Sequence, residues 1–356
     1  MEVRAAITNG DGEFAIETCE FAEPHAGEVL VEIKASGVCH TDYDSLRWNR
    51  QLILGHEGAG VVSAVGKGVT DLAPGARVML NWAIPCGACF QCQRGAENIC
   101  EQRGTVPDER FRFRKGTLNA SFSLGTMATH AIVPAAAVVP IPNQISFPVG
   151  AILGCGVMTG FGSVVNAAKL VPDSSAVVLG CGGVGLSAIQ GARFSRARQI
   201  IAIDVNQARL ELAKKFGASE TILATPADKG LLQAARTVKQ MTAGRGADYA
   251  FECTAVPELG PAPLAMVRSG GTAVGVSGIE QLVSVDMELF EWDKIYINPL
   301  YGQCRPKRDF PLLFDLYRQG RILLDEMITH TYPLEELPKA FSRMHAGSTA
   351  KGVIVF

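Results

Sequence analysis

The sequence lacks several features that would place the chain in a membrane, outside the cell or on nucleic acid. Its 356 residues include no uninterrupted run of about 18 apolar residues, so we expect no membrane span. The first residues lack the apolar core of a signal peptide, which favours a cytoplasmic protein. A formal net charge of only −2 gives no general attraction to nucleic acid or to an anionic membrane surface.

Size and cysteine content indicate a two-domain globular enzyme in a reducing compartment. The length predicts two domains, and a composition that is 47% hydrophobic and 19% charged is typical of a globular protein. The ten cysteines come without a secretion signal. In that context they predict metal-binding or catalytic thiols rather than a disulfide framework.

Four of these cysteines are clustered in one short segment, with two residues between each of the first three: Cys86, Cys89, Cys92 and Cys100. Four thiolates this close together can surround one tetrahedral metal, and zinc suits an all-sulfur site without redox chemistry. Iron–sulfur loops begin with a similar spacing, but their fourth cysteine follows after three residues and precedes a proline. Here seven residues intervene and Glu101 follows. The spacing therefore predicts a closed, structural zinc site that does no chemistry itself.

The two halves of the chain have different patterns. The first half contains short apolar runs punctuated by glycine and proline, which predict strands. From about residue 151, short apolar runs alternate with helix-length amphipathic segments, which is typical of βαβ units in a parallel sheet. Another helix and a final strand follow after about residue 301, and we expect them to rejoin the first domain. The expected strands include residues 174–180, 199–204 and 220–223, and the expected helices 182–195, 207–218 and 228–242.

A glycine pattern at the start of the second half predicts a dinucleotide site. It follows a strand, opens a helix and matches G-x-G-x-x-G over Gly180, Cys181, Gly182, Gly183, Val184 and Gly185. Such glycines let backbone N–H groups approach a pyrophosphate at the helix N-terminus. Asp204 ends the next strand, where a carboxylate accepts the ribose hydroxyls and repels a 2′-phosphate, which favours NAD over NADP. Arg209 lies close to Asp204 in the sequence and could bind a 2′-phosphate, so NADP stays open as an alternative coenzyme.

A second metal site is predicted from residues that are far apart in the sequence. Cys39, His56 and Cys155 each lie beside glycine-containing motifs. Singly, each is more often a packing residue. Together they supply the three ligands of a catalytic zinc that keeps one open position.

With these pieces in place, the chain resembles the zinc-dependent medium-chain alcohol dehydrogenases from end to end. Within that family it is similar to the class III and aryl- or terpene-alcohol branch. The resemblance implies a Rossmann NAD-binding domain, with a doubly wound parallel sheet, over residues 158–300, inserted in a mainly-β GroES-like catalytic domain over residues 1–157 and 301–356. The matching motifs are GVCHTD, GHEGAG, CGACFQCQRGAENIC, GCGVMTGFGSVVNAAK, VVLGCGGVG, IIAIDVNQARLELAKKFGA and ITHTYPLEELPKAF.

The resemblance also implies roles for individual residues. Thr41 takes the alcohol proton, Asp42 orients the ring of His56, and Glu57 stands behind the catalytic zinc as an occasional ligand. In several members the proton leaves through a histidine five positions after the first zinc cysteine, but here that position is Asp44. The coenzyme contacts that the resemblance implies are His40 and Lys351 for the pyrophosphate, and Val276, Leu300 and Tyr301 for the nicotinamide.

The substrate is less clearly indicated. Trp82 and Trp48 lie where the family places pocket residues, and two indoles favour a primary aromatic or allylic alcohol. The alternative is a thiol adduct of formaldehyde, as in class III enzymes, whose charged tail needs a cationic pocket mouth. The residues that would provide that mouth are Arg103, Arg110, Arg112, Arg114 and Lys115.

Two further expectations concern partners. A zinc-stabilised nucleic-acid-binding protein would account for the four-cysteine loop and for the basic stretch RFRFRK at residues 110–115. It would leave the dinucleotide pattern and the second metal set unexplained, and we expect no nucleic-acid partner. The resemblance implies a homodimer or homotetramer, with coenzyme domains meeting through a strand over residues 277–287.

Overall fold

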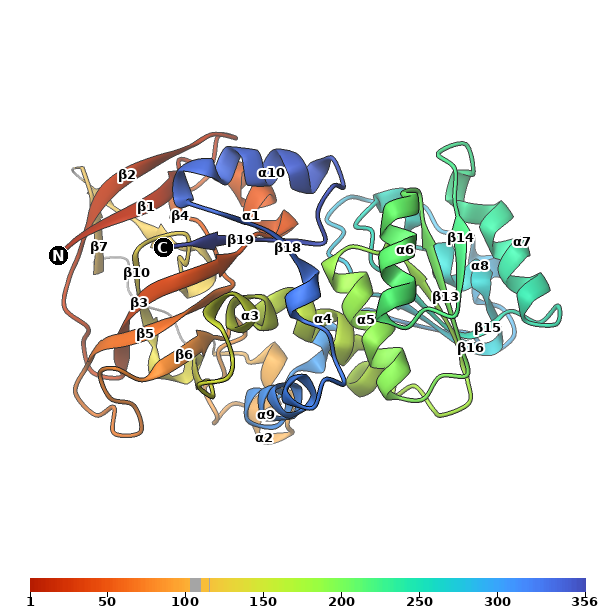
Figure 1. The fold of residues 1–356 in the computed structure, drawn as a ribbon, viewed down its shortest axis with the longest axis horizontal. Coiled ribbons are helices and arrows are strands. Elements are labelled where there is room, and N and C mark those ends of the chain that lie inside the picture. The colour runs from red at the N-terminus through yellow and green to blue at the C-terminus, as the bar shows by residue number, and fades with distance from the viewer. Residues whose placement is uncertain (103–109, 115) are drawn as a thin grey trace. The chain divides into compact units, whose positions relative to one another are not determined.

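The computed structural model describes residues 1–102, 110–114 and 116–356 and divides them into two compact units. The first unit comprises Met1–Cys155, Arg305–Gly320 and Leu324–Phe356. The second comprises Gly156–Cys304 and Arg321–Leu323. Figure 1 shows the chain passing from the first unit into the second and back, so the first unit is discontinuous in sequence.

The first unit is mainly β and contains two sheets. One sheet has the order β8-β7-β2-β1-β4-β9, and the other has the order β11-β6-β5-β3-β19-β18 with β10 paired to β3. Among the described strands of this unit, only the pairs β4–β9 and β18–β19 are parallel. The first sheet consists of β1 (Glu2–Thr8), β2 (Phe14–Phe21), β4 (Leu52–Ile53), β7 (Phe111–Phe113), β8 (Gly116–Thr117) and β9 (Asn119–Ala120). The second consists of β3 (Glu28–Gly37), β5 (Gly58–Val65), β6 (Arg77–Leu80), β10 (His130–Pro134), β11 (Val138–Pro140), β18 (Ile328–Tyr332) and β19 (Lys351–Val355).

Short helices connect and cover these sheets. The amphipathic helix α10 buries residues at spacings of three and four, namely Leu337, Ala340, Phe341 and Met344. They belong to one apolar cluster with Tyr332 and with Ile354 of β19, and α10 lies beside β19 in Figure 1. The α-helices of this unit are α1 (His40–Asp44), α2 (Phe90–Gln93), α3 (Phe147–Ile152), α9 (Pro306–Arg318) and α10 (Leu337–His345).

The second unit is a parallel sheet with helices on both faces. Its strand order is β14-β13-β12-β15-β16-β17, the order of doubly wound dinucleotide-binding folds. Side chains of α7 and α8 pack on one face, and α5 and α6 contact the strands from the other. Its strands are β12 (Ser175–Leu179), β13 (Gln199–Asp204), β14 (Glu220–Leu223), β15 (Ala247–Glu252), β16 (Val267–Gly275) and β17 (Ile295–Ile297). Its α-helices are α4 (Met158–Gly162), α5 (Gly183–Phe194), α6 (Gln207–Phe216), α7 (Leu232–Met241) and α8 (Ala262–Met266).

The segment expected to form an intersubunit strand is not a strand. Residues 277–286 have no helix or strand, and a 3₁₀ helix follows at Met287–Phe290. Within one chain β17 occupies the position beside β16, so this segment has no hydrogen-bonded neighbour. A strand between subunits would take its neighbour from a second copy, so the expected subunit contact stays a prediction.

One helical segment is long and apolar enough to cross a membrane by length and composition. It spans Phe147–Ala167 and has a mean hydropathy of 1.6 in its best window. The sequence expectation missed it because polar residues interrupt the run. Since 78% of that window is buried inside the protein, the segment behaves as a core helix.

Candidate metal and coenzyme sites

The four clustered cysteines converge in the structure as their spacing predicts. The sulfur atoms of Cys86, Cys89, Cys92 and Cys100 all lie within 4.8 Å of one another. Backbone N–H groups donate to these sulfurs: Cys89 N lies 3.3 Å from Cys86 Sγ, and Cys86 N lies 3.3 Å from Cys100 Sγ. The N–H of Cys92 is the main reason that the pKa of Cys89 falls to about 6. Four converging sulfurs held by backbone donors fit a closed zinc site.

A second cluster lies in the first unit and combines residues from three distant segments. Its ligand atoms belong to Cys39, His56, Glu57 and Cys155, and all lie within 4.8 Å of one another. His56 Nε2 is 3.3 Å from Cys155 Sγ. Two thiols, an imidazole and a nearby carboxylate form the donor set of a catalytic zinc site.

Local structure aims each of these side chains at the cluster. Cys39 is the N-cap of α1, and Asp42 closes the capping box by accepting a 3.0 Å hydrogen bond from Cys39 N. Cys155 lies in a π-helical turn over Leu153–Val157, a distortion frequently found at functional sites. Gly37 is required next to the cluster, because a Cβ there would lie 1.9 Å from Glu57 Oε2.

Asp42 also contacts the imidazole of the cluster. Its Oδ1 lies 2.7 Å from Nδ1 of His56, and both side chains are buried. A carboxylate at Nδ1 fixes the tautomer that presents an unprotonated Nε2, the form that binds a metal. This is the contact that the resemblance implied.

Glu57 and Lys351 form a buried ion pair beside the cluster. Lys351 Nζ lies 2.7 Å from Glu57 Oε1 and donates to Val38 O at 3.1 Å. Burial is the largest single influence and lowers the pKa of Lys351, but Glu57, Cys39 and Cys155 together outweigh it and raise the pKa of the ammonium. The second oxygen of Glu57 has no hydrogen-bond partner among the described residues. Lys351 is therefore held inside the unit by Glu57, and the pyrophosphate contact expected for it stays a prediction.

The remaining predicted residues of this region lie on α1. Thr41 Oγ1 is 3.8 Å from Cys39 Sγ, so its hydroxyl lies beside a ligand sulfur. Asp44 is exposed at the end of the helix. His40 packs edge-on against His345 of α10, with ring centroids 5.7 Å apart.

Three aromatic rings line the region around His56. Phe122 lies 4.9 Å from the imidazole, 5.2 Å from Trp82 and 5.9 Å from Trp48, measured between ring centroids. Both tryptophans are expected from the sequence, whereas Phe122 is not. Its backbone has φ 51° and Ser123 follows with φ 58°. No local motif signals a left-handed phenylalanine, so only the tertiary structure identifies this residue.

The arginines expected at a cationic pocket mouth have other partners. Arg110 is buried, 3.1 Å from Glu28 Oε2, and its Nη2 lies 2.6 Å from His25 Nδ1. The guanidinium of Arg114 lies 2.8 Å from Glu17 Oε1. Arg112 is exposed on β7, opposite Glu20 in the register. Arg110 and Arg114 are thus neutralised by acidic neighbours, while Arg103 and Lys115 lie outside the described residues.

The glycine pattern in the second unit has the expected strand–turn–helix geometry. Gly180 follows β12 with φ 85°, and Gly182 is the N-cap of α5. A Cβ at Gly185 would lie 1.8 Å from Gly180 O, so helix and strand approach closely. A Cβ at Gly182 would meet nothing within 4 Å. The turn therefore leaves open space above its backbone, as a diphosphate site requires.

Asp204 is bonded to this turn. Its Oδ2 accepts from Cys181 N at 2.7 Å, and its Oδ1 accepts from Asn206 N at 2.9 Å. Arg209 Nη1 lies 3.9 Å from Asp204 Oδ2. The carboxylate that we expect to bind the ribose is thus fixed at the end of β13 before any ligand arrives.

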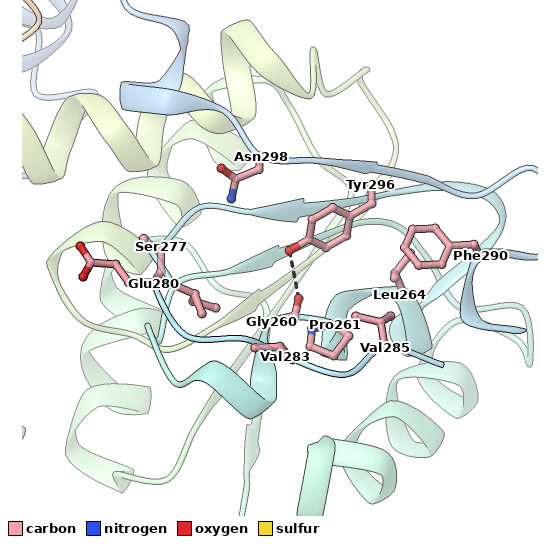
Figure 2. Close-up of a pocket in the computed structure, with 12 residues that line it drawn as sticks. Gly260, Pro261, Leu264, Ser277, Glu280, Val283, Val285, Phe290, Tyr296 and Asn298 are labelled. Carbon is pink, nitrogen blue, oxygen red and sulfur yellow. Dashed lines mark hydrogen bonds between the residues drawn. The ribbon is translucent and has the colours of Figure 1, made fainter. Parts of the chain in front are cut away.

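The residues expected to face the nicotinamide follow two other strands. Val276 is buried directly after β16, and its N–H donates to Glu252 O at 3.0 Å. Tyr301 is buried with φ 54°, and Leu300 before it is exposed. Next to Val276 the structure contains a pocket of about 470 Å³, shown in Figure 2, with Ser277 and Tyr296 on its wall. The hydroxyl of Tyr296 donates to Gly260 O at 3.1 Å (Figure 2).

Comparison with known proteins agrees with this geometry. Residues 25–143 match the family model for the alcohol dehydrogenase GroES-like domain, and residues 183–316 match that for zinc-binding dehydrogenases. The S-(hydroxymethyl)glutathione dehydrogenase of a Synechocystis species is 34% identical, and the match covers 99% of this chain and 100% of the relative. The class-3 alcohol dehydrogenase of Cereibacter sphaeroides is also 34% identical, with complete coverage of both chains.

Solved structures give the same result. A zinc-binding-domain alcohol dehydrogenase from Burkholderia ambifaria has a TM-score of 0.90 and 30% identity over 100% of this chain and 99% of that one. Benzyl alcohol dehydrogenase from Acinetobacter calcoaceticus has a TM-score of 0.89 and 29% identity over the same shares. The chain therefore belongs to the zinc-dependent medium-chain alcohol dehydrogenases, with a GroES-like catalytic domain and a Rossmann domain.

Proposed function

We propose that this chain interconverts a primary alcohol and its aldehyde, with zinc and NAD as its cofactors. The observation that carries the proposal is the convergence of Cys39, His56 and Cys155 on one point, with Asp42 fixing the imidazole. When bound there, zinc acts as a Lewis acid that polarises the reacting oxygen and favours loss of its proton. The four-cysteine site serves only the fold.

The chain's own residues bind and orient the reactants. The hydroxyl of Thr41 accepts the proton of the alcohol as it gives up its own, and Asp44 or water at the exposed end of α1 passes that proton to solvent. Lys351 neutralises Glu57 behind the cluster, which keeps a second negative charge from opposing the reaction.

NAD is held by the second unit. The backbone of the glycine turn binds the diphosphate, and Asp204 binds the adenosine ribose and repels a 2′-phosphate. His40 contributes to the diphosphate site, while Val276 and the backbone at Leu300 and Tyr301 face the nicotinamide. Support comes from the open space above Gly182 and from the fixed carboxylate of Asp204.

For the substrate, the site favours a primary aromatic or allylic alcohol. Phe122 lies beside His56, and Trp48 and Trp82 pack against Phe122. Aromatic pairs add attraction beyond simple burial. The structural neighbour from Acinetobacter calcoaceticus is a benzyl alcohol dehydrogenase, which supports this choice.

The second candidate is a hydroxymethyl thiol adduct, and the sequence relatives support it better than the aromatic alcohol. Three of the most similar relatives, including that of Synechocystis, are named S-(hydroxymethyl)glutathione dehydrogenase or class-3 alcohol dehydrogenase. The described arginines 110 and 114 argue against a cationic mouth built from them, because each already has an acidic partner.

An assay of NADH formation distinguishes the two candidates. Purified zinc-loaded enzyme is given benzyl alcohol, an allylic alcohol, ethanol, or formaldehyde premixed with glutathione. The aromatic proposal requires the highest kcat/KM with benzyl alcohol and a loss of about tenfold or more in Phe122→Ala for that substrate. A higher kcat/KM with the glutathione adduct would establish the second candidate. No NADH from any of them would refute the proposed function.

Assembly and location are part of the proposal. A homo-oligomer is supported by large apolar side chains exposed on the second unit around β17, namely Leu282, Val285, Met287, Trp292 and Ile295. A cytoplasmic location is supported by the free cysteines, which a reducing compartment maintains. A monomeric mass by light scattering at micromolar concentration would contradict the assembly.

A further inference from the structure

Glu252 is a fully buried carboxylate at the centre of the sheet edge where the coenzyme is proposed to bind. It is the last residue of β15 and is 0% exposed. In the register it pairs with Leu179 at the end of β12 and with Gly275 at the end of β16. Gly180 and Val276 follow those two residues. Glu252 therefore lies between the turn proposed for the diphosphate and the residue proposed to face the nicotinamide.

The two oxygens of this carboxylate have different surroundings. Oε1 accepts hydrogen bonds from Thr254 N at 2.5 Å, Thr254 Oγ1 at 2.6 Å and Ala255 N at 3.0 Å. Oε2 is buried and has no hydrogen-bond partner in the described part of the chain. Within residues 1–102, 110–114 and 116–356, no lysine, arginine or histidine forms an ion pair with Glu252. The turn that it holds is thus fixed, but its charge is not balanced by a cation.

The negative charge of Glu252 affects the ionisation of Cys253 and Tyr296, but neither group neutralises it. Burial and the carboxylate of Glu252 raise the pKa of the adjacent Cys253, so that thiol stays neutral. Burial and Glu252 likewise raise the pKa of Tyr296, whose ring lies on the wall of the pocket in Figure 2. A buried, unpaired charge is costly and acts over a longer range than an exposed one, because little water screens it.

We infer that the charge of Glu252 makes the coenzyme site distinguish the two oxidation states of the coenzyme. It strengthens the binding of NAD⁺ and leaves the binding of NADH nearly unchanged. The inference rests on the proposed binding of NAD to the second unit. The oxidised nicotinamide ring carries a positive charge and the reduced ring carries none, whereas the adenosine and diphosphate groups are the same in both. Contacts from Asp204 or the glycine turn therefore affect both forms equally. Only a charge that acts on the nicotinamide changes the ratio of the two affinities.

The test measures equilibrium binding of three ligands to the zinc-loaded enzyme: NAD⁺, NADH and ADP-ribose, which lacks the nicotinamide. Glu252→Gln keeps the shape and an amide oxygen that accepts from Thr254 and Ala255, but removes the charge. We expect the Kd of NAD⁺ to rise about tenfold, which is about 1.4 kcal/mol. An energy of this size is expected for two unit charges about 10 Å apart at an effective dielectric constant of about 20. The Kd values of NADH and ADP-ribose change less than about twofold.

Two further variants separate charge from shape. Asp248→Asn removes another carboxylate of β15, but one already bound to Arg268 and Ser175, and we expect it to leave the NAD⁺/NADH affinity ratio unchanged. Glu252→Asp retains the charge on a shorter side chain, and we expect it to weaken all three ligands similarly while keeping the ratio. A change of the ratio in Glu252→Asp, which keeps the charge, would contradict the inference whether or not Glu252→Gln folds.

The possible outcomes are distinct. Equal weakening of NAD⁺, NADH and ADP-ribose in Glu252→Gln would show that Glu252 only shapes the Thr254–Ala255 turn, and would overturn the inference. An unchanged ratio would overturn it as well. Failure of the unsubstituted enzyme to bind any of the three ligands would instead refute the proposed NAD site.

Discussion

The contact between Asp42 and His56 gives the sharpest test of the metal site, and Asp42→Asn is the perturbation. The carboxylate receives hydrogen bonds on both oxygens, from His56 Nδ1 at 2.7 Å and from Cys39 N at 3.0 Å. An asparagine has only one acceptor oxygen. If its oxygen stays on Cys39 N, its amide N–H₂ faces the imidazole, and Nδ1 must become the acceptor. The proton then moves to Nε2, which prevents that nitrogen from binding a metal.

The expected loss follows from this change of tautomer. Removing a carboxylate that orients a ligating histidine typically costs 10- to 100-fold in metal affinity or activity, or about 1.4–2.8 kcal/mol. The burial of both side chains excludes water as a replacement partner, so we expect the upper part of that range. Competition with a chromogenic chelator measures zinc affinity directly, and kcat is measured at saturating zinc.

A matched control separates this effect from general destabilisation. Asp309 is another buried carboxylate of the first unit and also accepts from a backbone N–H, that of Arg305 at 2.7 Å. It is not among the residues of the metal cluster. Asp309→Asn should lower the melting temperature without changing zinc affinity. Unchanged zinc affinity in Asp42→Asn, with circular dichroism like that of the unsubstituted protein, would refute the tautomer argument.

Three other outcomes follow from the two metal sites and the coenzyme site. Each subunit should contain two zinc ions by elemental analysis; Cys92→Ser should remove one and lower the melting temperature, because a structural zinc contributes folding energy, and a finding of iron would contradict the assignment. Asp204→Gly should weaken NAD binding and relieve discrimination against NADP in competition assays, whereas an unsubstituted enzyme that already prefers NADP would disprove this reading. Thr41→Ala should reduce alcohol oxidation by roughly 10²-fold at unchanged zinc content while Thr41→Ser is mild; full activity in Thr41→Ala would mean that the proton leaves by another route.

The parts of the protein that the sequence predicted are those fixed by local geometry. The cysteines at 86, 89, 92 and 100 are close in sequence, so a short loop brings their sulfurs together with little help from the fold. The glycine turn at 180–185 is likewise local, since strand, turn and helix follow one another directly. Each family motif is also a short contiguous segment that can be recognised without the fold, and together these motifs identified the fold class and the zinc-dependent dehydrogenase activity.

Local reasoning does not settle a strand whose neighbour is distant. Within one chain β17 takes the place beside β16, and residues 277–286 have no regular structure; whether they form a strand against a second subunit stays a prediction. The apolar helix at 147–167 was missed as a candidate span because its polar residues interrupt the run. Sequence composition does not reveal which segment pairs with the edge of a sheet, or which apolar helix is buried by the rest of the protein.

The tertiary structure decided which distant side chains come into contact at each site, although the family motifs named several of them. His56 and Cys155 are 99 residues apart, and Lys351 and Glu57 are 294 apart, yet each pair is in direct contact. Phe122 reaches His56 through a left-handed backbone that no motif announces. Glu252 looks like an ordinary strand residue in the sequence. Glu252 is buried, with one oxygen unpartnered among the described residues, because β12, β15 and β16 end side by side. The packing of distant segments, and not local propensity, sets the dielectric constant around a charge and the partners available to it.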